Sequence, residues 1–166
     1  ARIDSMGKAE RMKIQADSLY KAGRYNSAIK CYLEILRDIG SDDNVGNAFY
    51  ARVAYSVGTI YARMFMCKSA NAFFSYAHEL SPDPMYAKAC VYMSIIADDD
   101  EELLSSIVKF RISDDSLDSI RKRVNATRRE AESGEQSSWL DEQLSDETFA
   151  DQLIEIWKEN YYKMLK

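Results

Sequence analysis

The sequence has little of several residue types that define other protein classes. Its 166 residues include only six glycines and two prolines, too few for a collagen-like or proline-rich chain. No apolar run approaches the roughly 18 residues that a membrane-spanning helix needs. At 46% hydrophobic residues, the chain is too apolar for wholesale disorder. The length suits one domain, and few helix breakers beside abundant Ala, Lys, Glu, Met and Tyr predict an all-α fold.

Groups for catalysis or metal binding are also scarce. His78 is the only histidine, so a Ser/His/Asp or Cys/His arrangement has a single possible base. Three cysteines without a C-x-x-C pair argue against a disulfide framework or a zinc site. No glycine-rich phosphate loop or hydrolase motif occurs. We therefore expect a protein that is not an enzyme and that uses no metal or cofactor.

Cysteine use and the first residues bear on the compartment. The chain starts without a basic residue cluster followed by an apolar run, so no signal peptide is visible. Unpaired cysteines are typical of a reducing compartment. We expect a cytoplasmic protein, or the cytosolic portion of a longer chain.

Charge is unevenly distributed along the chain. Residues 1–97 carry 12 Lys and Arg against 9 Asp and Glu, a net charge of +3. Residues 98–166 carry 10 against 18, a net charge of −8. Opposite signs indicate two different surfaces, which either meet different partners or attract each other within the chain.

Apolar residues recur at helical spacing in two similar segments. In residues 8–39 the helical pattern is interrupted at Gly23 and resumes at Tyr25, and residues 44–80 show the same arrangement. Residues 24–28 align with residues 66–70 at an offset of 42 residues. A fixed offset between two helical hairpins is typical of a repeat protein built as a solenoid.

Small, aromatic and proline residues mark fixed positions of the second segment: Gly58, Tyr61, Ala70, Phe74, Ala77 and Pro82. With this spacing the segment resembles a tetratricopeptide repeat (TPR). The first segment resembles the same repeat less completely, through Ala16, Gly23, Tyr25, Ala28 and Tyr32. The small residues let paired helices approach, and the aromatic residues fill the gap against the neighbouring pair. The resemblance implies a right-handed superhelical solenoid of helix-turn-helix units.

The pattern divides the chain into a repeat region, 1–112, and a C-terminal extension. TPR-like units are expected at about 8–40 and 44–84, and a divergent unit at 85–112 has helices at 85–97 and from the acidic run 98–102 to about residue 110. A usual repeat has about 34 residues. The second unit therefore has extra residues between positions 39 and 50. Candidate N-caps there predict a lengthened first helix: Ser41, Asp42 and Asp43. Residues 113–166 are expected to pack on the repeats through helices at 116–131 and 146–166, the latter amphipathic.

The first helix of each pair lines a concave groove in TPR proteins, and this groove holds a peptide. The resemblance implies ten groove residues in this chain: Lys13, Asp17, Tyr20, Lys21, Arg52, Tyr55, Ser56, Thr59, Arg63 and Tyr86. Such a basic, tyrosine-lined groove would suit an acidic or C-terminal peptide with an apolar anchor. Of the residues with which one TPR subclass clamps chaperone tails, only Lys13 is present. We expect a scaffold or adaptor that binds a protein or peptide partner.

Two other surfaces offer alternatives. The amphipathic helix at 146–166 could pack onto a second copy, forming a homodimer, or onto another domain of a longer protein, which would give the chain a structural or oligomerisation role. Arg121 and Arg128, like Lys122 and Arg129, share a helix face that could hold phosphates. Surrounding carboxylates and the lack of interleaved aromatic residues favour a solvated, salt-bridged helix. We expect neither nucleic acid as a partner nor membrane insertion.

Overall fold

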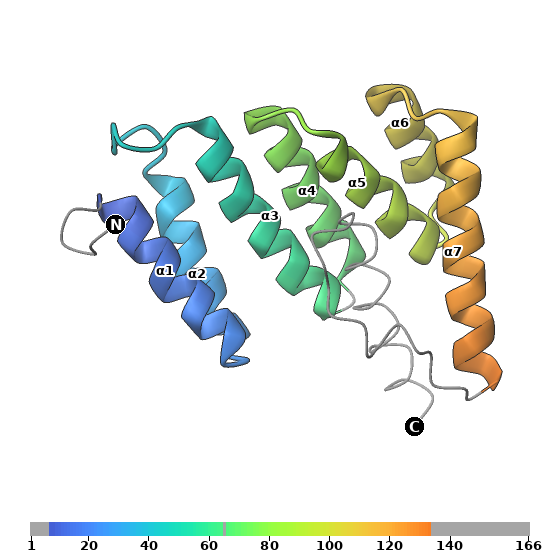
Figure 1. The fold of residues 1–166 in the computed structure, drawn as a ribbon, viewed down its shortest axis with the longest axis horizontal. Coiled ribbons are helices and arrows are strands. Elements are labelled where there is room, and N and C mark those ends of the chain that lie inside the picture. Colours follow the sequence, from blue (N-terminus) through green and yellow to red (C-terminus); the bar gives the residue numbers. More distant parts are fainter. Residues whose placement is uncertain (1–6, 65, 134–166) are drawn as a thin grey trace.

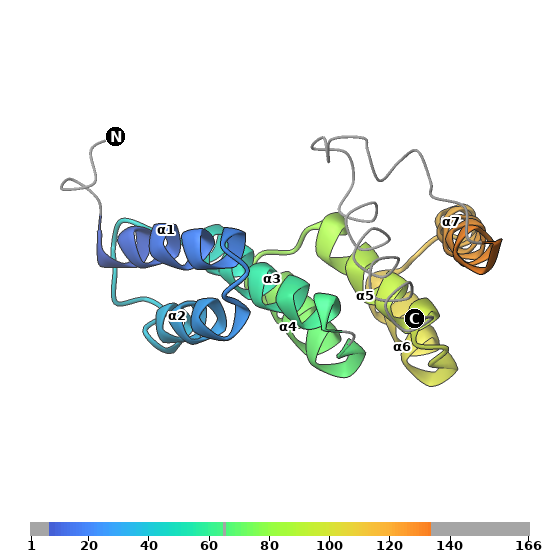
Figure 2. The same ribbon diagram turned by 90° about the horizontal axis from the view of Figure 1, so that it is seen from below.

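The structure is a computed structural model, and it describes residues 7–64 and 66–133. These ranges contain seven helices and no strand, which confirms the predicted all-α fold class. The helices are α1 (Lys8–Lys21), α2 (Tyr25–Arg37), α3 (Asn47–Arg63), α4 (Cys67–Leu80), α5 (Pro84–Ile96), α6 (Asp100–Phe110) and α7 (Asp114–Ser133). They follow one another in chain order along a row (Figure 1). Figure 2 shows α1, α3 and α5 in one layer and α2, α4 and α6 in a second layer.

The helices occur where the sequence pattern predicts them. The pairs α1–α2 and α3–α4 fall within the first two expected units, α5–α6 begins one residue before the third at Pro84, and α7 covers the helix expected at 116–131. The amphipathic segment 146–166 lies outside the described residues. The description of the C-terminal extension therefore ends with α7.

A glycine in a left-handed conformation forms the turn between α1 and α2. Gly23 has a φ of 77°, which residues with a side chain adopt only at a cost. The N–H of Gly23 donates to the carbonyl of Tyr20 (3.0 Å), and the N–H of Arg24 donates to that of Leu19 (2.9 Å). The two bonds form a Schellman motif, which satisfies carbonyl groups at the end of α1 while the chain reverses.

The packing of α3 on α4 depends on a glycine within α3. A Cβ atom added at Gly58 would lie 2.6 Å from Cε1 of Phe74 and 3.2 Å from the backbone oxygen of Ala70. The Phe74 side chain is fully buried, and its ring centroid lies 5.9 Å from that of Tyr55. Small residues at positions 58 and 70 therefore let these helices approach, as the sequence pattern predicts.

The segment between α2 and α3 differs from the prediction. A helix was expected to begin near Ser41, Asp42 or Asp43, but α3 begins at Asn47 with Gly46 as its N-cap. α3 is longer than α1, with 17 residues against 14, so part of the added segment does lengthen this helix, and the rest forms a loop at positions 38–46. The prediction failed because an Asp or Ser followed by apolar periodicity does not reveal which helix end its side chain will reach.

Asp42 caps a different helix, α1. The N–H of Ala9, in the first turn of α1, donates to Oδ2 of Asp42 (3.2 Å), and the N–H of Asn44 donates to its Oδ1 (2.9 Å). The N-cap residue of α1, Gly7, has no side chain to do this. The hydrogen bonds from Asn44 and Ala9 lower the pKa of the Asp42 carboxyl because they stabilise its charged form.

α5 is the central helix of the C-terminal half. Ten of its 13 residues are buried, so it is surrounded on every side. Its start is fixed by Asp83, whose carboxylate accepts a hydrogen bond from the N–H of Met85 (2.8 Å). The apolar cluster around α5 includes Leu103 of α6 and Val124 of α7. This cluster holds α5 against both following helices.

Candidate functional site

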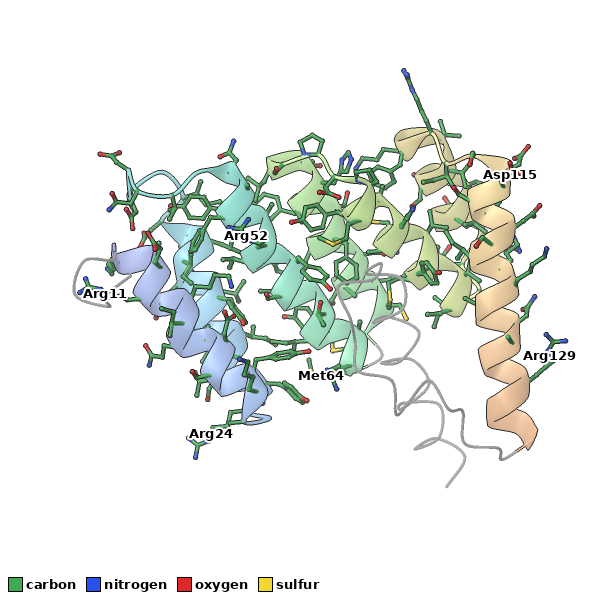
Figure 3. The ribbon with its side chains drawn as sticks, in the orientation of Figure 1. Arg11, Arg24, Arg52, Met64, Asp115 and Arg129 are labelled. Atoms are coloured by element: carbon green, nitrogen blue, oxygen red, sulfur yellow. The ribbon has the colours of Figure 1, made fainter. Side chains whose placement is uncertain are left out.

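The ten groove residues all lie on helices of one layer (Figure 2). Four are on α1, five on α3, and Tyr86 is on α5. Figure 3 shows Arg52 on the N-terminal half of α3. Their contacts differ, and they separate into residues at an open pocket, residues bound to one another across helices, and residues inside the protein.

An open pocket of about 490 Å³ lies between α1, the N-terminal part of α3 and the loop before α3; we call it the α1–α3 pocket. Three groove residues line it: Lys13, Asp17 and Arg52. The other lining residues are outside the predicted set: Glu10, Ile14, Asn44, Val45, Gly46, Ala48 and Phe49. Repeat spacing assigns no position to loop residues. For this reason the 44–46 wall of the pocket gave no signal in the sequence.

Asp17 is held by two neighbours. Its Oδ2 forms an ion pair with Nζ of Lys13 (2.8 Å), and its Oδ1 accepts a hydrogen bond from the hydroxyl of Tyr32 on α2. Tyr32 is 1% exposed, and burial followed by the bond to Asp17 raises the pKa of its phenol. The i,i+4 spacing of Lys13 and Asp17 is readable from sequence. The bond from Tyr32 is not, because it depends on how α1 packs on α2.

Tyr20 and Arg63 join α1 to α3. Nε of Arg63 donates a hydrogen bond to the hydroxyl of Tyr20 (2.9 Å), and its Cζ lies 5.7 Å from the centroid of the Tyr20 ring. The Tyr20 ring also meets Tyr25 of α2 edge to face, with centroids 5.6 Å apart. These two predicted groove residues therefore serve contacts within the protein.

The remaining groove residues of α3 and α5 lie mostly inside. Thr59 and Tyr86 are 8% and 4% exposed, so their side chains are buried and offer almost no surface to a partner. Tyr55 lies between Phe74 and Tyr86, its ring centroid 6.0 Å from that of Tyr86, and burial raises the pKa of its phenol. The hydroxyl of half-buried Ser56 donates to the Arg52 carbonyl (3.0 Å). Tyr55 and Tyr86 were expected to line an exposed groove, but they pack against each other inside the protein.

Charge at the α1–α3 pocket is mixed. Its lining pairs two cations, Lys13 and Arg52, with two carboxylates, Glu10 and Asp17. Lys13 is half-buried and paired with Asp17, whereas the side chain of Arg52 is exposed. Arg52 is therefore the cation of this lining that a partner would contact. Lys21 is also exposed, at the last residue of α1. A partner would meet the Arg52 cation, the Glu10 carboxylate and an apolar surface here, in place of a continuous basic groove.

The thiols and the histidine have structural contacts. All three cysteines are free, and burial raises the pKa of each thiol, that of Cys90 to about 12. A reactive thiol needs the opposite shift. The half-buried ring of His78 meets Phe110 edge to face, with centroids 4.8 Å apart, and burial lowers its pKa.

The other predicted features involve α7 and metal or membrane binding. Arg121, Lys122 and Arg129 have exposed side chains on α7, and Arg129 points away from the other helices (Figure 3). Within the described ranges, no group of three or more His, Cys, Asp or Glu residues could hold a metal ion. No helix of residues 7–64 and 66–133 combines the length and apolarity needed to cross a membrane.

Comparison with known proteins adds no relative from which a role could be transferred. No protein-family model, curated protein or solved structure matches the chain. The functional argument therefore depends on the residues and contacts described above.

Proposed function

We propose that this chain is a protein-interaction module, a scaffold or adaptor, that binds a peptide or protein segment across α1 and α3. The observation that carries the proposal is the α1–α3 pocket, where exposed Arg52 lies beside the apolar side chains of Ile14, Val45 and Phe49. Ile14 is 43% exposed, a large apolar side chain left in contact with solvent. An apolar anchor with a neighbouring carboxylate fits this lining.

The proposal extends to the architecture. Paired helices in two layers, Gly58 against Phe74 and Ala70, and the Gly23 turn support a TPR-like superhelical solenoid. In such a solenoid the first helices of successive pairs form the inner surface. The position of the α1–α3 pocket on two of these helices supports its use as a binding site.

The proposed mechanism is recognition without chemistry. Arg52 forms a charge-assisted hydrogen bond with a carboxylate of the partner, from an acidic residue or a C-terminus. The apolar lining buries the apolar anchor of the partner. The Glu10 carboxylate repels partners that carry a second acidic group next to this anchor. We propose a cytoplasmic setting, supported by three free thiols, and no enzymatic activity, supported by the raised thiol pKa values.

A peptide-selection experiment tests this function. The immobilised protein selects from random displayed peptides, half of which end in a free carboxylate, and the affinities of enriched peptides are then measured. We expect enrichment of an aliphatic or aromatic residue next to Asp, Glu or the C-terminus. Arg52→Glu should weaken binding of these peptides about tenfold or more, because it removes a charge-assisted bond and adds repulsion.

Arg37→Glu is the matched control, because Arg37 is an exposed arginine on α2 in the other layer. It makes the same charge change without touching the α1–α3 pocket. Equal loss of affinity in both variants would show that only net charge matters. Peptides that bind Arg52→Glu as tightly as the native chain would refute this site.

A further inference from the structure

A second pocket lies on the opposite layer, between the N-terminal parts of α4 and α6. It has a volume of about 380 Å³, and we call it the α4–α6 pocket. α4 contributes Lys68, Asn71 and Ser75, α5 contributes Ser94, and the start of α6 contributes Asp99 and Glu102. None of these residues belongs to the groove residues. This pocket is therefore independent of the proposed peptide site.

The two helices come together at the other end of the pocket. His78 of α4 meets Phe110 of α6, with ring centroids 4.8 Å apart. Nζ of Lys109, also on α6, donates a hydrogen bond to Oγ of Ser75 (2.8 Å). An ammonium group thus already binds at the rim of this pocket. Toward their N-termini the helices are separated by the pocket, with α5 beneath.

Asn71 provides a buried acceptor on the pocket lining. The residue is 8% exposed, and its Nδ2 donates to Oγ of Ser94 (3.3 Å). The hydroxyl of Ser94 donates its proton to the carbonyl of Cys90 (2.8 Å), so Oγ of Ser94 can only accept a hydrogen bond from Asn71. This fixes the orientation of the amide. Oδ1 of Asn71 is left buried without a hydrogen-bond partner among the described residues.

Charge on the lining favours a cation. Two carboxylates, Asp99 and Glu102, line the pocket beside one ammonium, that of Lys68, and the ammonium of Lys109 lies at the rim. Asp99 is held in place because its Oδ1 accepts a hydrogen bond from the N–H of Glu102 (3.1 Å). The acidic run at positions 98–102 adds further negative charge at the same turn. An unpartnered acceptor and this acidic run together favour a ligand that donates a hydrogen bond and carries positive charge.

We propose that the α4–α6 pocket binds a primary alkylammonium group, which donates to Oδ1 of Asn71 and pairs with Asp99 and Glu102. An ammonium has three donors on a compact charge, enough to meet an amide oxygen and two carboxylates together. The volume also admits the aliphatic chain that carries the ammonium. The source is either a small free amine or a lysine side chain of another protein.

Titration calorimetry of the intact chain with pentane-1,5-diamine and with Nα-acetyl-lysine methylamide tests the proposal. Tetramethylammonium at equal ionic strength is the reference, because it carries the charge without an N–H donor. We expect at least one primary amine to bind and to shift the side-chain amide resonance of Asn71 in ¹H–¹⁵N spectra. Binding of the diamine alone assigns a small amine, and binding of the lysine derivative assigns a protein lysine.

Variants separate the pocket from general charge effects. Asn71→Leu and Glu102→Gln should each weaken amine binding about tenfold or more, since each removes a hydrogen bond to the charged group. Glu101→Gln is the matched control, an exposed acid on the same turn that does not line the pocket. Exposed Glu102 can be changed without disturbing the core, which keeps the test valid if Asn71→Leu unfolds. Equal binding of tetramethylammonium, no binding of either amine, or unchanged binding in Glu102→Gln would overturn the proposal.

Discussion

Replacing Gly58 by alanine tests the contact on which the α3–α4 pair depends. The added Cβ would lie 2.6 Å from Cε1 and 2.7 Å from Cδ1 of Phe74, whereas carbon atoms pack best at about 3.5–4.0 Å. The ring would have to move by about 1 Å, yet Phe74 is 0% exposed. The backbone oxygen of Ala70, 3.2 Å from the added atom, limits movement of α3 itself.

Two opposing effects set the size of the change. Alanine within a helix is favoured over glycine by about 1 kcal/mol. Overpacking a well-filled core costs about 1–3 kcal/mol, and the contacts with both a buried ring and backbone place this site in the upper part of that range. We expect the free energy of unfolding to fall by about 1–2 kcal/mol.

Urea denaturation followed by circular dichroism measures this loss as a lower midpoint at unchanged slope. Gly46→Ala is the control, because nothing lies within 4 Å of a Cβ at this N-cap position. It should cost only the roughly 0.5–1 kcal/mol by which an N-cap position prefers glycine to alanine, with no packing cost added. In the double variant Gly58→Ala/Phe74→Leu, the smaller side chain should recover about 1 kcal/mol of the clash. A Gly58→Ala protein as stable as the native one, or additive costs in the double variant, would refute the reasoning.

Two further predictions concern helix ends. Because hydrogen bonds lower the pKa of Asp42, its stabilising effect is present above the ordinary pKa of an aspartate and is lost as the pH falls through the lower, folded-state value. Between pH 7 and about pH 3 the native chain should therefore lose more unfolding free energy in urea than Asp42→Asn, whereas Asp43→Asn should follow the native curve. Arg111, the C-cap of α6, has a φ of 53°, so Arg111→Gly should raise the unfolding free energy by about 1 kcal/mol. An unchanged urea midpoint would show that this conformation carries no strain.

Helix positions could be predicted from the sequence because the residues that determine a helix lie close together in the chain. Apolar residues at helical spacing indicated the first four helices, the acidic run at 98–102 indicated the start of α6, and the small residue at position 58 indicated a close approach of two helices. Gly23 marked the first turn for a similar reason, since a positive φ selects glycine. Each of these signals depends on residues near one another in the chain or on the demands of a single position.

The loop and the pocket could not be predicted because they depend on distant contacts. Asp42 was recognised as an N-cap candidate, but the N–H that it reaches, that of Ala9 in α1, lies 33 residues earlier. Arg63 was expected to face a partner, yet it binds Tyr20, 43 residues away. The Arg63–Tyr20 pairing depends on how one pair of helices packs on the next, and the Asp42–Ala9 pairing depends on how the loop after α2 lies against α1. Spacing within a repeat contains no information about either contact.

The row of helices also determines how the protein opens. Each of the helices α1 to α6 packs chiefly against the helices before and after it in the chain. The first pair can separate by losing the Tyr20–Arg63 contact and the apolar cluster that α1 and α2 share with α3, while the cluster around α5 stays closed. The α3–α4 pair has neighbours on both sides and cannot open without exposing two interfaces. Amide hydrogens should therefore exchange faster at the two ends of the row, in α1 and α2 and in α6 and α7, than in its middle.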